Sequence, residues 1–124
     1  MFDWLAEPSP PPHVGLLLLP GFSLAELALW RTAHACLQQL TGPAAGTCPT
    51  LSVDGRPVLS DLGLPVPADG ALTPAALDTL SVLLVFASGL PAALPPSDAL
   101  VVTLSAARDP RRVLGGVHGG AFWL

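Results

Sequence analysis

The chain has 124 residues, which is enough for one domain with a modest core. Apolar residues make up 51% and charged residues 11%, a balance that argues against intrinsic disorder. The net charge of −4, with five arginines and no lysine, argues against nucleic-acid binding by these residues alone.

The first 41 residues predict a lead-in, a buried strand and a long helix. Residues 1–13 contain four prolines within five positions and predict a disordered or extended lead-in. The apolar run Val14–Leu19 has the length of a central parallel strand, and it is too short to cross a bilayer. Ser23-Leu-Ala-Glu26 has the pattern of a capping box, which predicts a helix that ends near Leu40.

The middle of the chain predicts short strands. Thr50–Val53 is expected to be a strand, and Asp54-Gly55 is expected to turn it into a second strand at Pro57–Ser60, so that the two form a hairpin. Leu64–Val66 is expected to be a short edge strand, because edges tolerate proline.

The second half predicts alternating helices and strands. Thr73-Pro74 begins a helix that ends near Leu80, and a buried strand follows at Ser81–Phe86, with an exit loop at Ala87–Leu90. A further helix begins at Ser97, and Val113–Val117 is the last strand. This alternation predicts an α/β fold with a mostly parallel sheet, whose ligands bind at the carboxyl ends of the strands.

His118 is the first candidate site residue. It lies between glycines, in Gly116-x-His118-x-Gly120, directly after an apolar run. A strand, a sharp turn and a helix start resemble a nucleophile elbow, which would hold His118 above a pocket. The amides that begin at Gly119 would then point at a bound anion or carbonyl. Alternatively, the glycines only make a tight turn and His118 is a loop residue.

Glu26, Ser88 and Gly89 are the other candidates. Glu26 could reach the pocket from its helix as a base or hydrogen-bond partner, or its carboxylate could simply cap the Ser23 amide. Ser88 and Gly89 follow a buried strand and could offer backbone amides to an oxyanion, or they form an ordinary loop.

Cysteine and metal chemistry have little support in the sequence. Cys36 and Cys48 make no disulfide framework, and neither occupies the elbow. One histidine and one carboxylate fall short of a three-ligand metal set, so no metal or cofactor is expected. The acidic N-terminus lacks the basic region of a secretion signal, so a cytoplasmic protein is expected.

Four stretches together resemble the ThiJ/PfpI-like, class I glutamine amidotransferase-like domain found at the N-terminus of AraC-type transcriptional regulators of the GlxA group. They are Val14–Ser23, Leu51–Val58, Leu77–Val85 and Leu114–Phe122. The resemblance implies a flavodoxin-like three-layer α/β sandwich over residues 14–124, with residues 1–13 as the lead-in. It also implies that the domain is incomplete at its C-terminus, and that the chain is a fragment or a truncated product.

The resemblance also assigns roles to the candidate residues. Related enzymes have an acidic residue that falls on Glu26, a Gly-Gly loop that falls on Ser88-Gly89, and a nucleophilic cysteine that falls on His118. Because histidine replaces the cysteine, the domain is expected to sense a ligand and not to be an enzyme. The ligand site is expected at Glu26, Ser88, Gly89, His118 and Gly119.

The resemblance implies the partners as well. They are a small-molecule effector, amino-acid-like or a quaternary amine, and a second copy in a homodimer. DNA would be bound only through a helix-turn-helix domain absent from this chain, and no membrane is expected. Two alternatives remain: a ThiJ/PfpI-like hydrolase or glyoxalase-type enzyme, and a truncated remnant that binds a partner protein.

Overall fold

The computed structural model describes residues 11–87 and 112–118, and the structural statements below concern these residues. Its elements, in chain order, are β1 (Val14–Leu18), α2 (Leu24–Thr41), the 3-10 helix η1 (Gly42–Ala45), β2 (Thr50–Ser52), β3 (Val58–Leu59), β4 (Pro65–Val66), β5 (Gly70–Ala71), α3 (Pro74–Asp78), β6 (Val82–Ala87) and β7 (Val113–His118).

Five of the strands form one parallel sheet with the order β5-β2-β1-β6-β7. From β1 the chain first adds β2 on one side and later adds β6 and β7 on the other side. The strand order therefore reverses between β1 and β6, which is the position where open α/β sheets bind ligands. The predicted α/β fold with a mostly parallel sheet is confirmed.

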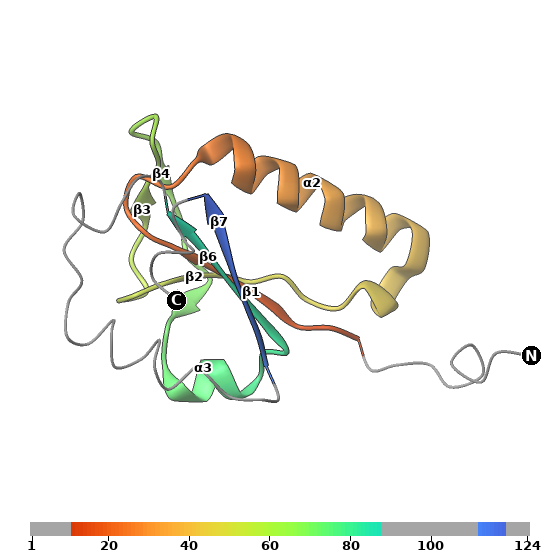
Figure 1. The fold of residues 1–124 in the computed structure, drawn as a ribbon. Coiled ribbons are helices and arrows are strands. Elements are labelled where there is room, and N and C mark those ends of the chain that lie inside the picture. Colours follow the sequence, from red (N-terminus) through yellow and green to blue (C-terminus); the bar gives the residue numbers. More distant parts are fainter. Residues whose placement is uncertain (1–10, 88–111, 119–124) are drawn as a thin grey trace, which may run out of the picture.

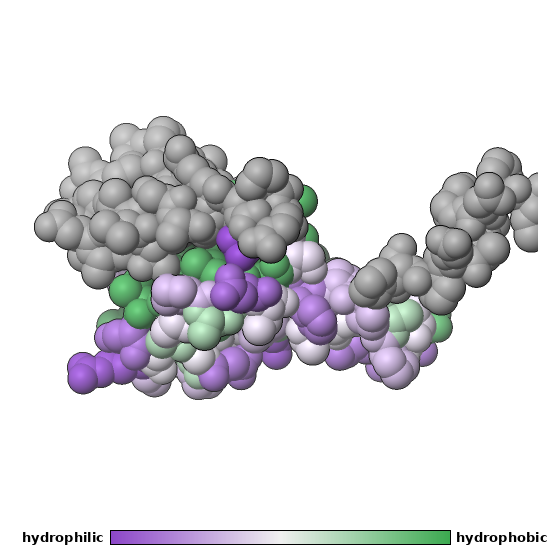
Figure 2. Space-filling model, turned by 90° about the horizontal axis from the view of Figure 1, so that it is seen from below, coloured by the Kyte–Doolittle hydropathy of each residue, from purple (hydrophilic) through white to green (hydrophobic). Residues whose placement is uncertain are grey.

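The two helices cover opposite faces of this sheet, so the molecule has three layers (Figure 1). Leu16 and Leu18 of β1 pack in a cluster with Leu27 of α2. Leu17 packs in the second cluster with Leu77 of α3. Because β1 is buried on both faces, its sequence is continuously apolar and does not alternate. The face on the α3 side mixes hydrophilic and hydrophobic residues (Figure 2).

Both described helices begin as the sequence predicts. The Ser23 side chain accepts a hydrogen bond from the Glu26 amide at 3.3 Å, and α2 ends at Gly42, whose φ is +62°. The Thr73 hydroxyl accepts from the Ala76 amide at 3.1 Å, and Pro74 is the first residue of α3. These side chains satisfy amides that have no partner within the first helical turn.

The predicted hairpin between residues 50–53 and 57–60 is wrong. Both edges of β2 are occupied, by β1 and by β5. β3 therefore pairs with β4, in an antiparallel hairpin with Val58 opposite Val66. A bridge between Phe22 and Ser60 ties this hairpin to the exit of β1. The predicted edge strand at Leu64–Val66 is confirmed as β4.

The end of the proline-rich lead-in is attached to the amino-end side of the sheet. The Pro12 carbonyl accepts from the Thr47 amide at 3.0 Å. The His13 amide donates to the Ser81 hydroxyl at 3.0 Å, and His13 Nδ1 lies 2.7 Å from Thr47 Oγ1. The rest of the lead-in, the exit-loop residues 88–90 and the helix predicted from Ser97 lie outside the described residues. Within the described part, no helix is long and apolar enough to cross a membrane.

Candidate functional site

The predicted site lies at the carboxyl ends of β1, β6 and β7. Beyond β1, the Leu19 amide donates to the Phe86 carbonyl at 3.0 Å, so the pairing with β6 continues to the edge of the sheet. The chain then turns into α2, which carries Glu26 in its first turn. The topology therefore brings the segment with Glu26 and the end of β7 to the same edge of the sheet (Figure 1).

Glu26 is half-buried at the start of α2. Its amide takes part in the cap through Ser23, which confirms one half of the capping box. The other half, in which the Glu26 carboxylate accepts from the Ser23 amide, stays a prediction. A second cap was not predicted: Asp61 Oδ1 accepts from the Leu24 amide at 3.1 Å. Asp61 lies 37 residues away on the loop of the β3–β4 hairpin, so no local pattern indicates this contact.

His118 is the last residue of β7, where its backbone pairs with Ala87 of β6. The strand was expected to end at Val117, so it is one residue longer than predicted. His118 is therefore part of the strand and not part of the turn that follows it. Two strand spacings of about 4.8 Å separate β7 from β1, so their ends are about 10 Å apart. Ser88, Gly89 and Gly119, the remaining predicted site residues, lie outside the described residues.

Neither cysteine lies at this edge of the sheet. Cys36 is exposed on α2, and Cys48 is buried just before β2, at the amino ends of the strands. Burial raises the pKa of the Cys48 thiol, and the nearby Trp30 and Arg31 offset part of that rise. A thiol with a raised pKa is mostly protonated near neutral pH and is a poor nucleophile. The two cysteines therefore offer no cysteine nucleophile to the candidate site.

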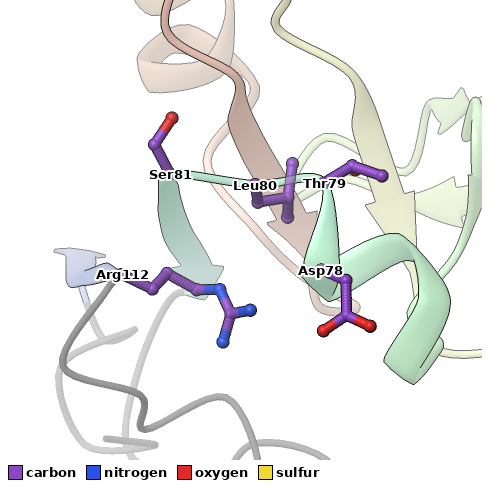
Figure 3. Close-up of a pocket in the computed structure, with 5 residues that line it drawn as sticks. All are labelled: Asp78, Thr79, Leu80, Ser81 and Arg112. Carbon is purple, nitrogen blue, oxygen red and sulfur yellow. The ribbon is translucent and has the colours of Figure 1, made fainter.

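Several cavities lie at the opposite, amino ends of the strands, and two of them have charged residues in their lining. The first, of about 430 Å³, lies between the end of α3 and the starts of β6 and β7. The Arg112 side chain extends toward the end of α3, which carries Asp78 (Figure 3). Arg112 Nη2 donates to the Leu77 carbonyl at 2.7 Å, which places a cation at the C-terminal end of α3.

The second cavity, of about 440 Å³, lies between α2 and the segments that lead into β2 and β5. Arg31 and His34 contribute to it from α2, and Asp69 contributes from the start of β5. Arg31 Nη1 donates to the Cys48 carbonyl at 2.6 Å, which fixes the guanidinium against the sheet. No pattern in the sequence predicted this cavity.

Metal binding gains no support from the described residues, which contain no group of three His, Cys, Asp or Glu side chains that could hold an ion.

Comparison with solved structures shows the fold and one closer likeness. The chain is similar to an AraC family transcriptional regulator from Pseudomonas putida, with 30% identity, a TM-score of 0.72 and coverage of 86% of this chain and 64% of that one. It also resembles a DJ-1 superfamily protein from Agrobacterium tumefaciens, with 23% identity, a TM-score of 0.61 and coverage of 85% and 52%. A ThiJ/PfpI domain protein from Brachyspira murdochii matches at 10% identity and a TM-score of 0.62, with coverage of 91% and 61%.

These likenesses confirm the resemblance to the ThiJ/PfpI-like domain and the flavodoxin-like α/β fold. The chain spans between half and two thirds of the length of each of the three proteins. No protein-family model and no curated protein sequence matches the chain.

Proposed function

We propose that this chain, which has the ThiJ/PfpI-like fold, is the small-molecule-sensing and dimerisation domain of an AraC-type transcriptional regulator. The observation that carries the proposal is the 30% identity, over 86% of the chain, to an AraC family regulator. The replacement of the elbow cysteine by His118 also supports a role in binding and not in turnover. We place the domain in the cytoplasm, where such a regulator would act on DNA.

The effector site of this proposal is the carboxyl edge of the sheet at the switch between β1 and β6. Glu26 would supply a negative charge from the first turn of α2, and His118 would supply an imidazole from the end of β7. Ser88, Gly89 and Gly119 would contribute backbone amides. A carboxylate and an imidazole at this edge of the sheet would suit a small zwitterion, with its ammonium group toward Glu26 and its carboxylate toward His118.

The experiment uses glycine betaine, a quaternary ammonium carboxylate, in isothermal titration calorimetry with the wild-type chain. Acetate carries only the carboxylate and tetramethylammonium carries only the quaternary ammonium group, so the two serve as comparison probes. We expect glycine betaine to bind, and we expect Glu26→Gln and His118→Ala each to weaken it about tenfold, the size of one lost charged hydrogen bond.

The matched controls replace the same residue types at the amino ends of the strands. Asp78→Asn removes an exposed carboxylate, and His34→Ala removes an imidazole, both far from the proposed site. Both should bind glycine betaine like the wild type. Equal losses in the controls and in the site variants would overturn the assignment of the site to the carboxyl edge.

DNA contact is proposed through a helix-turn-helix module other than these 124 residues. The chain has net charge −4 and only five cationic side chains, which is a poor surface for the DNA backbone. The proposed homodimer would couple two such modules. The support for the homodimer is the low burial of α2. Of the 18 residues in this helix, only Leu27 is buried, so the helix has surface that a second copy could cover.

A further inference from the structure

A third cavity, of about 290 Å³, lies on the other side of β1 from the proposed effector site. It opens at the carboxyl ends of β1 and β2, beside the β3–β4 hairpin. Three segments of the chain each contribute residues to its lining: Leu18 and Pro20 from the end of β1, Ser52 and Val53 from the end of β2, and Val58 and Leu59 from β3. Its volume is near the lower end of the range for ligand pockets, and its lining is mostly apolar.

The hairpin that borders the cavity is held in place by the exit of β1. The Gly21 amide donates to the Leu59 carbonyl at 2.9 Å, and the Asp61 amide donates to the Phe22 carbonyl at 2.8 Å. These two bonds fix the position of the hairpin that borders the cavity. Such a preformed site loses little conformational entropy when a ligand binds.

Ser52, one of the residues that line this cavity, has a buried polar side chain. Its side chain is 2% exposed, and its hydroxyl has no hydrogen-bond partner within the described part of the chain. A buried hydroxyl without a partner is costly, so most such groups bond to protein, water or ligand. Ser60, which is also buried, shows the usual arrangement, because its hydroxyl accepts from the amides of Leu62 and Leu64.

The charged residue of the cavity already has a cation beside it. Asp54 is the charged residue in the lining, and its Oδ1 accepts from the Arg56 amide at 3.0 Å. Its Oδ2 also lies 3.9 Å from Arg56 Nε. Because this carboxylate has a cation beside it and is exposed, it gives a charged ligand little gain for the loss of hydration.

From these observations we propose that the cavity binds a small uncharged molecule with a compact apolar body and one hydroxyl or carbonyl group. The apolar body contacts the leucine and valine side chains, and the polar group hydrogen-bonds to the Ser52 hydroxyl. This site is independent of the Glu26–His118 site, since it lies between β1 and β2 and uses none of the same side chains.

Cyclohexanol, which has these features, is the probe for the test. It is titrated into the ¹⁵N-labelled chain while amide chemical shifts are recorded, beside cyclohexylamine and cyclohexanecarboxylate, which are charged at pH 7. Cyclohexanol should cause saturable shifts in residues 52–59, and the two charged analogues should bind several-fold more weakly. No saturable shift in these residues, or tighter binding of a charged analogue, would overturn the proposal.

Leu59→Trp and Leu62→Trp form the first matched pair of variants. Both leucines are exposed on the same hairpin, at 56% and 71%, but only Leu59 lines the cavity. The larger ring at position 59 should fill the cavity and abolish cyclohexanol binding, whereas Leu62→Trp should bind like the wild type. Unchanged binding by a folded Leu59→Trp chain contradicts the placement.

Ser52→Ala and Ser60→Ala form the second pair. Ser52→Ala should weaken cyclohexanol binding about two- to tenfold, the range expected for one hydrogen bond, and should leave the melting temperature unchanged or raise it. Ser60→Ala should lower the melting temperature, because two amides lose their acceptor. If Ser52→Ala lowers the melting temperature as much as Ser60→Ala and leaves binding unchanged, the hydroxyl is structural and the proposal fails.

Discussion

At the scale of single residues, Cys48 makes stability depend on alkaline pH. Burial raises the pKa of its thiol above the ordinary value of 9.0, so the folded chain keeps the proton while the unfolded chain loses it. The free energy of unfolding should therefore fall as pH rises above about 9, by at most about 1.4 kcal/mol per pH unit. The chain contains no lysine and no tyrosine, so few other groups titrate there.

Urea denaturation in reducing buffer between pH 8 and 10.5 measures this effect. Cys48→Ala should flatten the decline with pH, although it lowers stability at every pH through lost packing. Cys36→Ala is the control, because it removes the exposed thiol and leaves the buried one in place. A Cys48→Ala chain with the same slope as the wild type would show that burial of this thiol is not the cause.

Single residues also show what the sequence can reveal about a site. The amide of Glu26 and the Ser23 side chain are three positions apart, so their hydrogen bond follows from a local pattern. The Asp61 cap, and the lack of a partner for the Ser52 hydroxyl among the described residues, depend on segments that meet only in the folded chain. No spacing in the sequence indicates such contacts.

At the scale of elements, the glycines that end α2 and η1 should differ in how much stability is lost when each is replaced by alanine. Gly42 and Gly46 both have positive φ, at +62° and +73°. A Cβ at Gly42 would meet nothing within 4 Å, whereas a Cβ at Gly46 would lie 1.7 Å from the Pro12 carbonyl oxygen. Gly42→Ala should therefore cost about 1–3 kcal/mol from the backbone alone, because a φ of +62° with a ψ of −133° is a conformation that glycine adopts readily and alanine does not.

Gly46→Ala should cost a further 1–3 kcal/mol, because the segment around Pro12 must move to make room. Thermal denaturation of the two variants gives the comparison, with each serving as the control for the other. Equal melting temperatures would mean that the contact between Pro12 and Gly46 contributes nothing to stability.

Helices and strands were predictable to within about one or two residues where their signals are local. The caps at Ser23 and Thr73 and the apolar runs of β1 and β6 are examples. The β2–β3 hairpin failed for a different reason. A turn sequence such as Asp54-Gly55 permits a hairpin, but β5, which follows much later in the chain, occupies the edge of β2 that the hairpin would need.

At the scale of the whole molecule, α2 presents apolar side chains to solvent. Trp30, Leu37 and Leu40 recur at helical spacing and are all exposed, Leu37 at 44%. If the proposed homodimer forms through this face, Leu37→Glu should raise its dissociation constant at least tenfold, because a charge would be buried in an apolar contact. Sedimentation equilibrium over a range of concentrations measures the change.

Leu62→Glu is the control for this variant, because Leu62 is exposed on the hairpin loop, away from α2. It should associate like the wild type. A wild-type chain that stays monomeric at high micromolar concentration, or equal effects of the two variants, would contradict dimerisation through α2.

The attachment at His13 has a practical consequence for laboratory work. Because His13 bonds to Ser81 and Thr47, the chain enters the domain at the amino ends of the strands. A fluorophore, affinity tag or surface linker joined before residue 11 is therefore anchored at the side of the sheet opposite to both proposed ligand sites. The protein can be immobilised through that end while the carboxyl edge of the sheet faces the solution, which suits surface-based screening for its effector.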